Sequence, residues 1–218
     1  TQTVSWNVNE KLQAGKYTWI HMGGEPDPSA PHEFILSEDL LSPGMGDNSK
    51  LPQLDLVMNG MYRITLEGTD LAGNTGKKFV MSVVYDDVPP VLELKYPENN
   101  SAVNHLDISY SISEQLSLGE IIYTKIGGDP DPNSPIIINL ESKELEMSFD
   151  ERQKTIQIPM LNDGSIYNIQ FKGEDLATNK AESNLIESVK YDVTRPRIEI
   201  YYPTSNSYFM GSEININI

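Results

Sequence analysis

The chain has 218 residues, with 16 basic against 32 acidic side chains, a net charge of −16 and no cysteine. Such an acidic surface repels nucleic-acid phosphates and anionic membranes, which argues against both as partners, and it attracts cations such as calcium. The lack of cysteine excludes disulfides, thiolate metal sites and cysteine nucleophiles, and no apolar run reaches the ~20 residues of a membrane-spanning helix.

The first strands are predicted from apolar residues that alternate with polar ones. Residues 4–8 and the stretch around Trp19 read as two strands, and a third follows at Tyr62, Ile64 and Leu66, which alternate with polar neighbours. A period of two places one face of a strand on a core and the other in water, as in antiparallel sheets. No stretch of more than about ten residues has the period of an amphipathic helix.

From residue 89 onward the sequence predicts a complete set of strands. We expect them at residues 91–96, 106–112, 120–126, 167–173 and 185–191, with two or three more between 136 and 159. Trp6 and Tyr110 fall on equivalent strands, as do Trp19 and Tyr123, and we expect these aromatic residues to fill the core between two sheets.

Four landmarks show that the chain repeats itself. Residues 4–12 return at 108–116, 23–31 at 127–135, 70–74 at 175–179 and 85–90 at 191–196, so the offsets are 104, 104, 105 and 106. A period near 100 residues suits a whole domain, and short strands with turn signals at this spacing favour a two-sheet sandwich. We therefore predict one repeat at 1–88 that lacks its first strand, a complete repeat at 89–194, and at 195–218 the start of a third repeat or a donor strand.

The pattern Tyr-x-Ile-x-(Leu/Phe)-x-Gly-x-Asp-Leu-Ala-x-Asn, which ends at Asn74 and again at Asn179, resembles the end of one strand and the following turn in bacterial immunoglobulin-like repeats. The Tyr-Asp-x-x-x-Pro that begins at Tyr85 and Tyr191 resembles their interdomain joint. The resemblance covers nearly the whole chain. It implies an all-β fold of tandem immunoglobulin-like antiparallel β-sandwiches, in an extracellular protein of the bacterial cell surface.

Thr178 departs from this pattern, because the first repeat has Gly73 at that position. Threonine tolerates a positive φ poorly. The sequence therefore predicts that the second turn differs in shape from the first.

Catalytic constellations are not evident. His21, His32 and His105 lack metal-ligand or triad spacing, and the counterparts of the first two are Lys125 and Ile136. Acidic residues sit in duplicated loops, where two copies of a catalytic pair are improbable. We expect no enzymatic activity from this segment.

Carboxylates provide the strongest candidate site. In an immunoglobulin topology, the loop that carries Glu114 and the turn that begins at Asp175 meet where Asp86 and Asp87 enter the second repeat, and calcium prefers such oxygen ligands from flexible loops. We therefore predict an interdomain calcium site from these four residues. Glu10 and Asp70 mark the equivalent site of the first repeat. The alternative is that Asp70 and Asp175 only cap their own turns.

The function that the resemblance implies is a structural or adhesive rod, built from neighbouring repeats or from identical subunits head to tail. The alternative is a module that binds carbohydrate or protein through the loops at residues 25–32 and 129–135, as an accessory to an enzyme elsewhere in a longer chain. Residues 195–203 and 213–218 also alternate like strands. Either they are cut from a longer array, or residues 198–202 fill the gap beside the first repeat of the next subunit.

Overall fold

The computed structural model describes residues 4–155, 161–201, 205–206 and 208. Within these residues the chain consists mainly of antiparallel β-strands, and three short 3-10 helices are the helical segments. The all-β prediction is confirmed at this level. None of the described helices has the length and apolar character needed to cross a membrane.

In the first unit, the part of the chain from residue 4 onward forms six strands in two sheets. Four strands form one sheet in the order β3-β2-β5-β6, and β1 pairs with β4 in the other. The strands are β1 (Ser5–Val8), β2 (Leu12–Gly24), β3 (His32–Ile35), β4 (Gly44–Asp47), β5 (Gly60–Asp70) and β6 (Thr75–Val84), with the short helices η1 (Glu38–Leu40) and η2 (Asn48–Lys50).

The described residues of the second unit form nine strands, also in two sheets. One sheet has the order β11-β10-β13-β15-β8 with β14 beside β13, and the other has the order β12-β9-β7. The strands are β7 (Leu92–Tyr96), β8 (Ala102–Val103), β9 (Asp107–Ile112), β10 (Leu116–Gly128), β11 (Ile136–Asn139), β12 (Ser148–Thr155), β13 (Ser165–Asp175), β14 (Lys180–Glu182) and β15 (Ile186–Tyr191), with η3 (Ser142–Glu144). Each strand expected between 91 and 191 is present.

Each unit has its own hydrophobic core. The first core includes the buried residues Tyr17, Trp19, Leu36, Leu40, Tyr62 and Ile64. The second includes eighteen buried residues between Leu92 and Tyr191. Trp19, Tyr110 and Tyr123 are buried as the sequence predicts, whereas Trp6 is half-buried and packs against the rim of the first core.

Strand β13 shows why these residues form a sheet with two unlike faces. Its eleven residues alternate strictly between buried and half-buried positions. Tyr167, Ile169 and Phe171 point inward and are at most 1% exposed. Burial of such side chains contributes about 1.5–3 kcal/mol each relative to exposure in water, so the alternation specifies which face of the strand turns inward.

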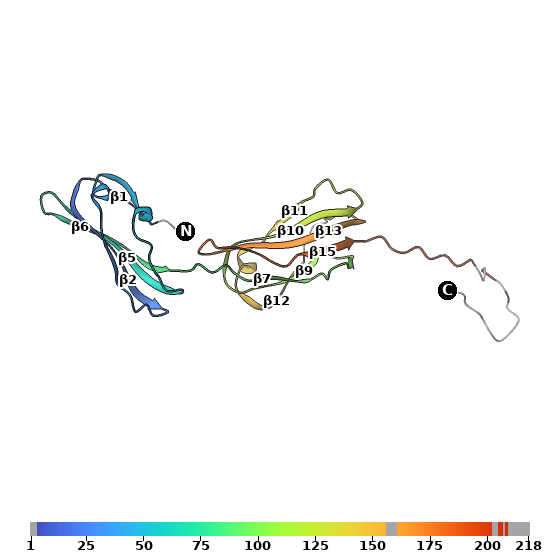
Figure 1. Ribbon diagram of the computed structural model, residues 1–218. Coiled ribbons are helices and arrows are strands. Elements are labelled where there is room, and N and C mark those ends of the chain that lie inside the picture. Colours follow the sequence, from blue (N-terminus) through green and yellow to red (C-terminus); the bar gives the residue numbers. More distant parts are fainter. Residues whose placement is uncertain (1–3, 156–160, 202–204, 207, 209–218) are drawn as a thin grey trace.

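The two units lie end to end (Figure 1), and residues 85–91 connect them. Beyond Tyr191 the chain leads away from the second unit. The alternation at residues 195–203 predicts a strand, yet the described part of that segment forms none. Among the residues that the structure describes, no strand pairs with it. Residues 213–218 lie outside the described residues.

The two Asp-Leu-Ala-x-Asn turns have the same shape, so the prediction of a different second turn is wrong. Thr178 adopts a φ of 72°, close to the 89° of Gly73. In both turns the first aspartate accepts N–H bonds from residues two and four positions later, at 2.7–2.9 Å. These bonds hold Thr178 in a conformation that its side chain disfavours.

Replacement of Thr178 by glycine should therefore stabilise the second unit. The relief of about 1–3 kcal/mol of backbone strain exceeds the roughly 0.5–1 kcal/mol that glycine loses in conformational entropy, so we expect a net gain of about 1 kcal/mol. Urea unfolding followed by circular dichroism would measure it. Tryptophan fluorescence should not change, because both tryptophans lie in the first unit. Gly73→Thr is the matched control, and it should destabilise the first unit.

A buried carboxylate anchors the loop after β2 in the first unit. Asp27 is 8% exposed. It accepts hydrogen bonds from the Tyr62 hydroxyl at 2.8 Å and the Ser29 N–H at 2.9 Å, and it pairs with His32 Nε2 at 2.7 Å. The second unit repeats the core of this arrangement, because Tyr167 donates to Asp131.

Asp27 makes the stability of the first unit dependent on pH. Burial raises the pKa of its carboxyl, but the hydrogen bonds from His32, Tyr62 and Ser29 outweigh burial and hold the pKa below the usual aspartate range. The stabilisation is therefore present above the ordinary aspartate pKa and is lost as pH falls through the lowered value.

Asp27→Asn should lower the stability of the first unit at pH 7 by about 1–3 kcal/mol, because buried donors lose their charged acceptor. It should also flatten the loss of stability in acid, as measured by tryptophan fluorescence during denaturant titrations between pH 7 and pH 2. Glu25→Gln, at an exposed position of the same loop, serves as control and should leave the acid profile unchanged. Parallel acid profiles for the wild type and Asp27→Asn would contradict the assignment.

Candidate metal centre

Three carboxylates meet where the connection between the units enters the second unit. Asp86 lies in that connection, Glu114 lies in the loop between β9 and β10, and Asp175 is the last residue of β13. One oxygen of each can be chosen so that all three lie within 4.8 Å of one another. Strand pairing produces this convergence, because Leu116 at the start of β10 lies opposite Asp175.

Asp175 is the fixed member of the group. It is 1% exposed, and its Oδ1 accepts the N–H groups of Ala177 and Asn179 at 2.7 and 2.9 Å. The Asn179 side-chain amide donates to Asp175 Oδ2 at 2.9 Å and also to the backbone carbonyl of Asp86 at 3.2 Å. Asn179 thus links the turn directly to the connection between the units. It was missed in the sequence, although it ends the repeated Asp-Leu-Ala-x-Asn motif.

Glu114 is the member of the group whose ionised form is disfavoured by its surroundings. Among the described residues it has no hydrogen-bond or ion-pair partner, and it is half-buried. Burial raises the pKa of its carboxyl, and the nearby charges of Asp86 and Asp175 raise it further. Two like charges at this separation disfavour ionisation of a third. A cation bound among the three would remove that repulsion.

The donor set fits a hard cation. All three side chains offer carboxylate oxygens, and the group contains no histidine or cysteine. Calcium takes 6–8 oxygen ligands, and zinc prefers nitrogen and sulfur. The three carboxylates would supply several of these ligands, and backbone carbonyls or waters would supply the remaining ones. The residues present therefore suit calcium, or magnesium, better than a transition metal.

The structure does not place Asp87 with the other three carboxylates. Its Oδ2 accepts a hydrogen bond from the Tyr85 hydroxyl at 2.8 Å. Asp86 instead lies beside the second unit, and its Oδ1 accepts the Val88 N–H at 3.1 Å. Consecutive residues of extended chain point in opposite directions, so one of two adjacent acids faces the group and the other does not.

Glu10 and Asp70 occupy the matching loops of the first unit. Asp70 caps its turn through bonds from the Asn74 side chain and the Asn74 and Ala72 N–H groups, as the alternative account predicts. These bonds, that of the Asn74 side chain above all, hold the pKa of the Asp70 carboxyl below the usual range. Within the described residues, no third acid or histidine completes a group with them. Turn capping therefore holds for both Asp70 and Asp175, and Asp175 additionally belongs to the three-carboxylate group.

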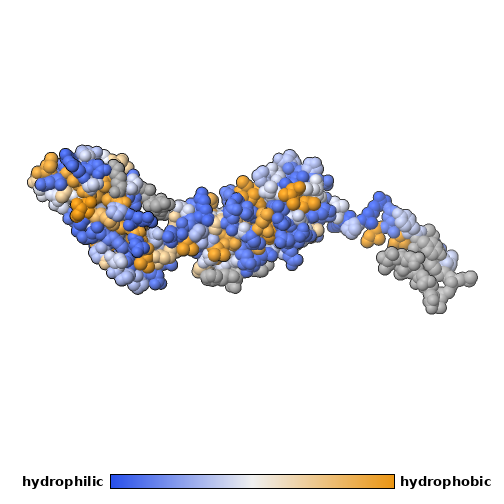
Figure 2. Space-filling model, in the orientation of Figure 1, coloured by the Kyte–Doolittle hydropathy of each residue, from blue (hydrophilic) through white to orange (hydrophobic). Residues whose placement is uncertain are grey.

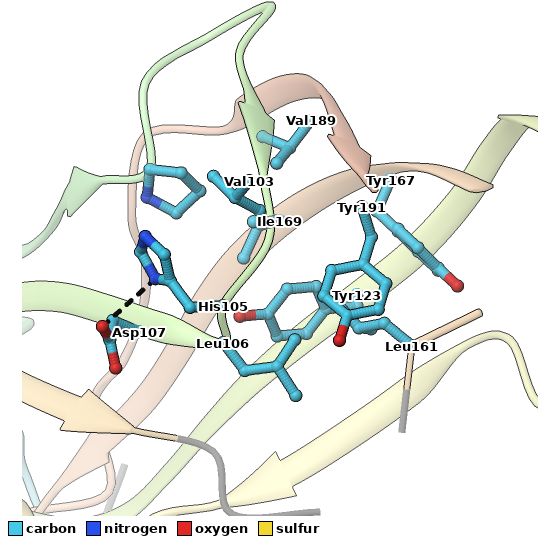
Figure 3. Close-up of a pocket in the computed structure, with 11 residues that line it drawn as sticks. Val103, His105, Leu106, Asp107, Tyr123, Leu161, Tyr167, Ile169, Val189 and Tyr191 are labelled. Carbon is cyan, nitrogen blue, oxygen red and sulfur yellow. Dashed lines mark ion pairs between the residues drawn. The ribbon is translucent and has the colours of Figure 1, made fainter. Parts of the chain in front are cut away.

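A small cavity lies inside the second core (Figure 3). Val103, Leu106, Tyr123, Ile169 and Val189 are among its lining residues. At the rim, His105 Nδ1 lies 3.1 Å from a carboxylate oxygen of Asp107. The cavity measures about 10 Å³, which is about the room that one water needs. It is a packing gap, far below the size of a ligand site.

Comparisons with known proteins give little guidance. No family model matches the chain, and no curated protein matches it. A solved structure from work on the host cell surface retention of a 1.5-MDa bacterial ice-binding adhesin is similar to 88% of this chain, at 11% identity and a TM-score of 0.32. The alignment covers 58% of that adhesin chain.

The raised pKa of Glu114 predicts how the stability of the metal-free second unit changes with pH. Below the ordinary glutamate pKa the carboxyl of Glu114 is protonated and does not lower the stability of the second unit. As pH rises from the ordinary pKa through the raised pKa, the second unit should lose stability, because folding disfavours the ionised carboxylate. Glu114→Gln removes the charge without changing the size of the side chain. In chelator it should melt higher than the wild type at pH 8 and no higher at pH 4. A lower melting temperature at pH 8 would show that Glu114 is not repelled.

Proposed function

We propose that this segment is part of an extended surface rod, in which each unit is an immunoglobulin-like sandwich and calcium stiffens the joint between units. The observation that carries the proposal is the junction itself. Three carboxylates from the connection and from two loops of the second unit converge there, and Asn179 links the same loop to the connection. The repulsion at Glu114 is relieved when a cation is bound.

The arrangement of the units supports a rod. Each core is built from residues of its own stretch of chain, and the units follow one another end to end (Figure 1). Such a chain gains reach with every added unit, but its stiffness depends on the joints. Pro89 and Pro90 limit rotation because their φ angles are fixed, and a bound cation would add a further restraint to Asp86.

The alternative of a binding module at the loops 25–32 and 129–135 gains less support. Asp27 and Asp131 at the centre of these loops are only 8% and 9% exposed. Each accepts a hydrogen bond from a core tyrosine. Their carboxylates therefore hold the loops to the core and do not face an outside ligand. The surface location and the adhesive partner of the rod are part of the proposal and rest on the resemblance described above.

Calcium should raise the thermal stability of the second unit and narrow the range of angles between the units. A cation present at about 100 times its Kd adds roughly 2.7 kcal/mol, which is a shift of several degrees in a chain of this size. Differential scanning calorimetry and small-angle X-ray scattering, each in calcium and in chelator, would measure the two effects.

Two variants make this test specific. Asp86→Asn should abolish both calcium effects, because it removes one of the three carboxylates. Asp87→Asn removes the adjacent charge, whose carboxylate is bonded to Tyr85, and should retain both effects. A wild-type chain with no calcium heat and no stabilisation would mean that packing, Asn179 and the prolines alone hold the joint.

A further inference from the structure

A tyrosine, a histidine and an aspartate form a hydrogen-bonded chain on the surface of the second unit. The Tyr96 hydroxyl lies 3.2 Å from His105 Nε2, and His105 Nδ1 lies 3.1 Å from Asp107 Oδ2. The tyrosine and imidazole rings are nearly parallel, with their centroids 5.8 Å apart. Figure 3 shows the imidazole and the carboxylate side by side at the rim of the core cavity. This relay of Tyr96, His105 and Asp107 joins three titratable groups in a row.

A shift in strand register turns Tyr96 outward. Leu92 and Leu94 of β7 point into the core, and continued alternation would turn Tyr96 inward as well. Leu94 lies opposite Tyr110, which is a core residue, but the register then shifts and sets Tyr96 opposite Ser109, on the other face of β9. An extra residue in one strand re-aims the side chains that follow it. The tyrosine is therefore presented at the surface and does not fill the core.

The other two members of the relay come from the stretch that leads into β9. Leu106 is buried, so its neighbours His105 and Asp107 face the opposite way. Their side chains are 45% and 46% exposed, and Tyr96 is half-buried. Figure 2 shows hydrophilic residues over much of the visible face of the second unit. The relay is thus accessible to water and to small solutes.

The hydrogen-bond partners determine where the protons of the relay lie. An ionised carboxylate only accepts, so Asp107 places the proton of a neutral His105 on Nδ1. The lone pair of Nε2 then accepts the Tyr96 hydroxyl. The order hydroxyl, imidazole, carboxylate is the one that activates a nucleophile, because the imidazole takes the proton of the attacking hydroxyl and the carboxylate stabilises the resulting imidazolium.

The geometry of the relay suits neither a metal ion nor a bound substrate. Tyr96 and Asp107 contact opposite nitrogens of the imidazole, so their oxygens do not converge on one point as metal ligands do. The cavity whose rim carries His105 measures about 10 Å³, which is far too small for a substrate. The relay therefore has the parts that activate a hydroxyl toward small electrophiles from solution, without a pocket that would hold them.

We propose that Tyr96 is a site of covalent acylation, which accepts acyl groups from donors with a good leaving group, such as thioesters and aryl esters. The Tyr96 oxygen attacks the acyl carbon, and its proton passes to His105 Nε2. The bond between the acyl carbon and the leaving group then breaks, and His105 returns the proton to the departing thiolate or aryloxide. The product is an aryl ester on Tyr96, and the step requires no oxidant or reductant.

Asp107 is the positioning residue of the relay. Its carboxylate holds the imidazole with the Nδ1–H toward it, and it stabilises the positive charge that His105 gains from the Tyr96 proton. The inference does not rest on the proposed calcium joint, because none of the three side chains belongs to the carboxylate group at the junction. Experiments in chelator therefore test the relay separately from the joint.

Competition among the 11 tyrosines of the 218-residue chain tests the proposal. The chain is treated in chelator at pH 8 with a limiting amount of p-nitrophenyl acetate, and peptide mass spectrometry measures the acetylation of each tyrosine. Tyr208, which is 98% exposed, is the reference for an accessible tyrosine. We expect Tyr96 to react at least about 10-fold faster than Tyr208 although it is less exposed, because a positioned base accelerates such steps by about 10²–10⁴-fold in enzymes.

Two results of this competition would overturn the proposal. One is acetylation of Tyr96 that is no faster than that of Tyr208. The other is an acetyl group found on His105 in place of Tyr96, which would make the imidazole the nucleophile and not the base.

Two variants separate the base from the ring contact. His105→Gln removes the base, and the acetylation rate of Tyr96 should fall at least about 10-fold. Tyr96→Phe keeps the ring and should lose this adduct alone, while the other tyrosines react as in the wild type. Urea unfolding establishes that both variants are folded. A folded His105→Gln chain that is acetylated at Tyr96 as fast as the wild type would show that His105 is not the base.

Asp107 acts through His105, so its test has a second readout. Asp107→Asn keeps an acceptor for the Nδ1–H but removes the charge, and should slow acetylation of Tyr96 by about 3-fold or more. Glu98→Gln removes the same charge at an exposed position and should have no effect. Nitrogen NMR should find the proton of neutral His105 on Nδ1 in the wild type and on Nε2, its usual site in free histidine, in Asp107→Ala. A wild-type proton on Nε2 would overturn the relay.

Discussion

The register between β10 and β13 is the constraint on which the second unit and its junction depend. Because the side chains of a strand alternate, a slip of one residue would turn the apolar face of β13 outward and its polar face into the core. Beyond the core pairs, a register shift between Leu116 and Leu118 sets Leu116 opposite Asp175, which brings the loop of Glu114 to the turn after β13. Core formation and the carboxylate group therefore follow from one set of strand pairs. The first unit has the matching register, with Leu12 opposite Asp70.

Much of this could be read from the sequence. The alternation around Tyr167 predicts β13 because a face with a period of two is a local property, and the repeated landmarks predict equivalent turns in both halves. The convergence of Asp86, Glu114 and Asp175 was also predicted, since the order of strands in a sandwich determines which loops are neighbours. That prediction needed the topology but no detail of any side chain.

The remainder depended on contacts that no local pattern reveals. The bond between Tyr62 and Asp27 joins residues 35 positions apart, and its existence follows from how a loop folds over a strand end. Whether Asp86 or Asp87 belongs to the three-carboxylate group depends on which of these adjacent side chains faces the second unit. Thr178 was mispredicted because steric preference is only one part of the energy of a turn, and the hydrogen bonds to Asp175 determine its shape.

The short pairing of β8 with β15 has a mechanical consequence. These two strands run parallel, and hydrogen bonds from Asn100, Lys190 and Asp192 extend the contact on both sides. Tension on the ends of the second unit would draw the opening strands and β15 in opposite directions along their lengths. The bonds between them would then be sheared together and would not open one after another like a zipper. Resistance to pulling would thus be concentrated where the first and last strands of the unit meet.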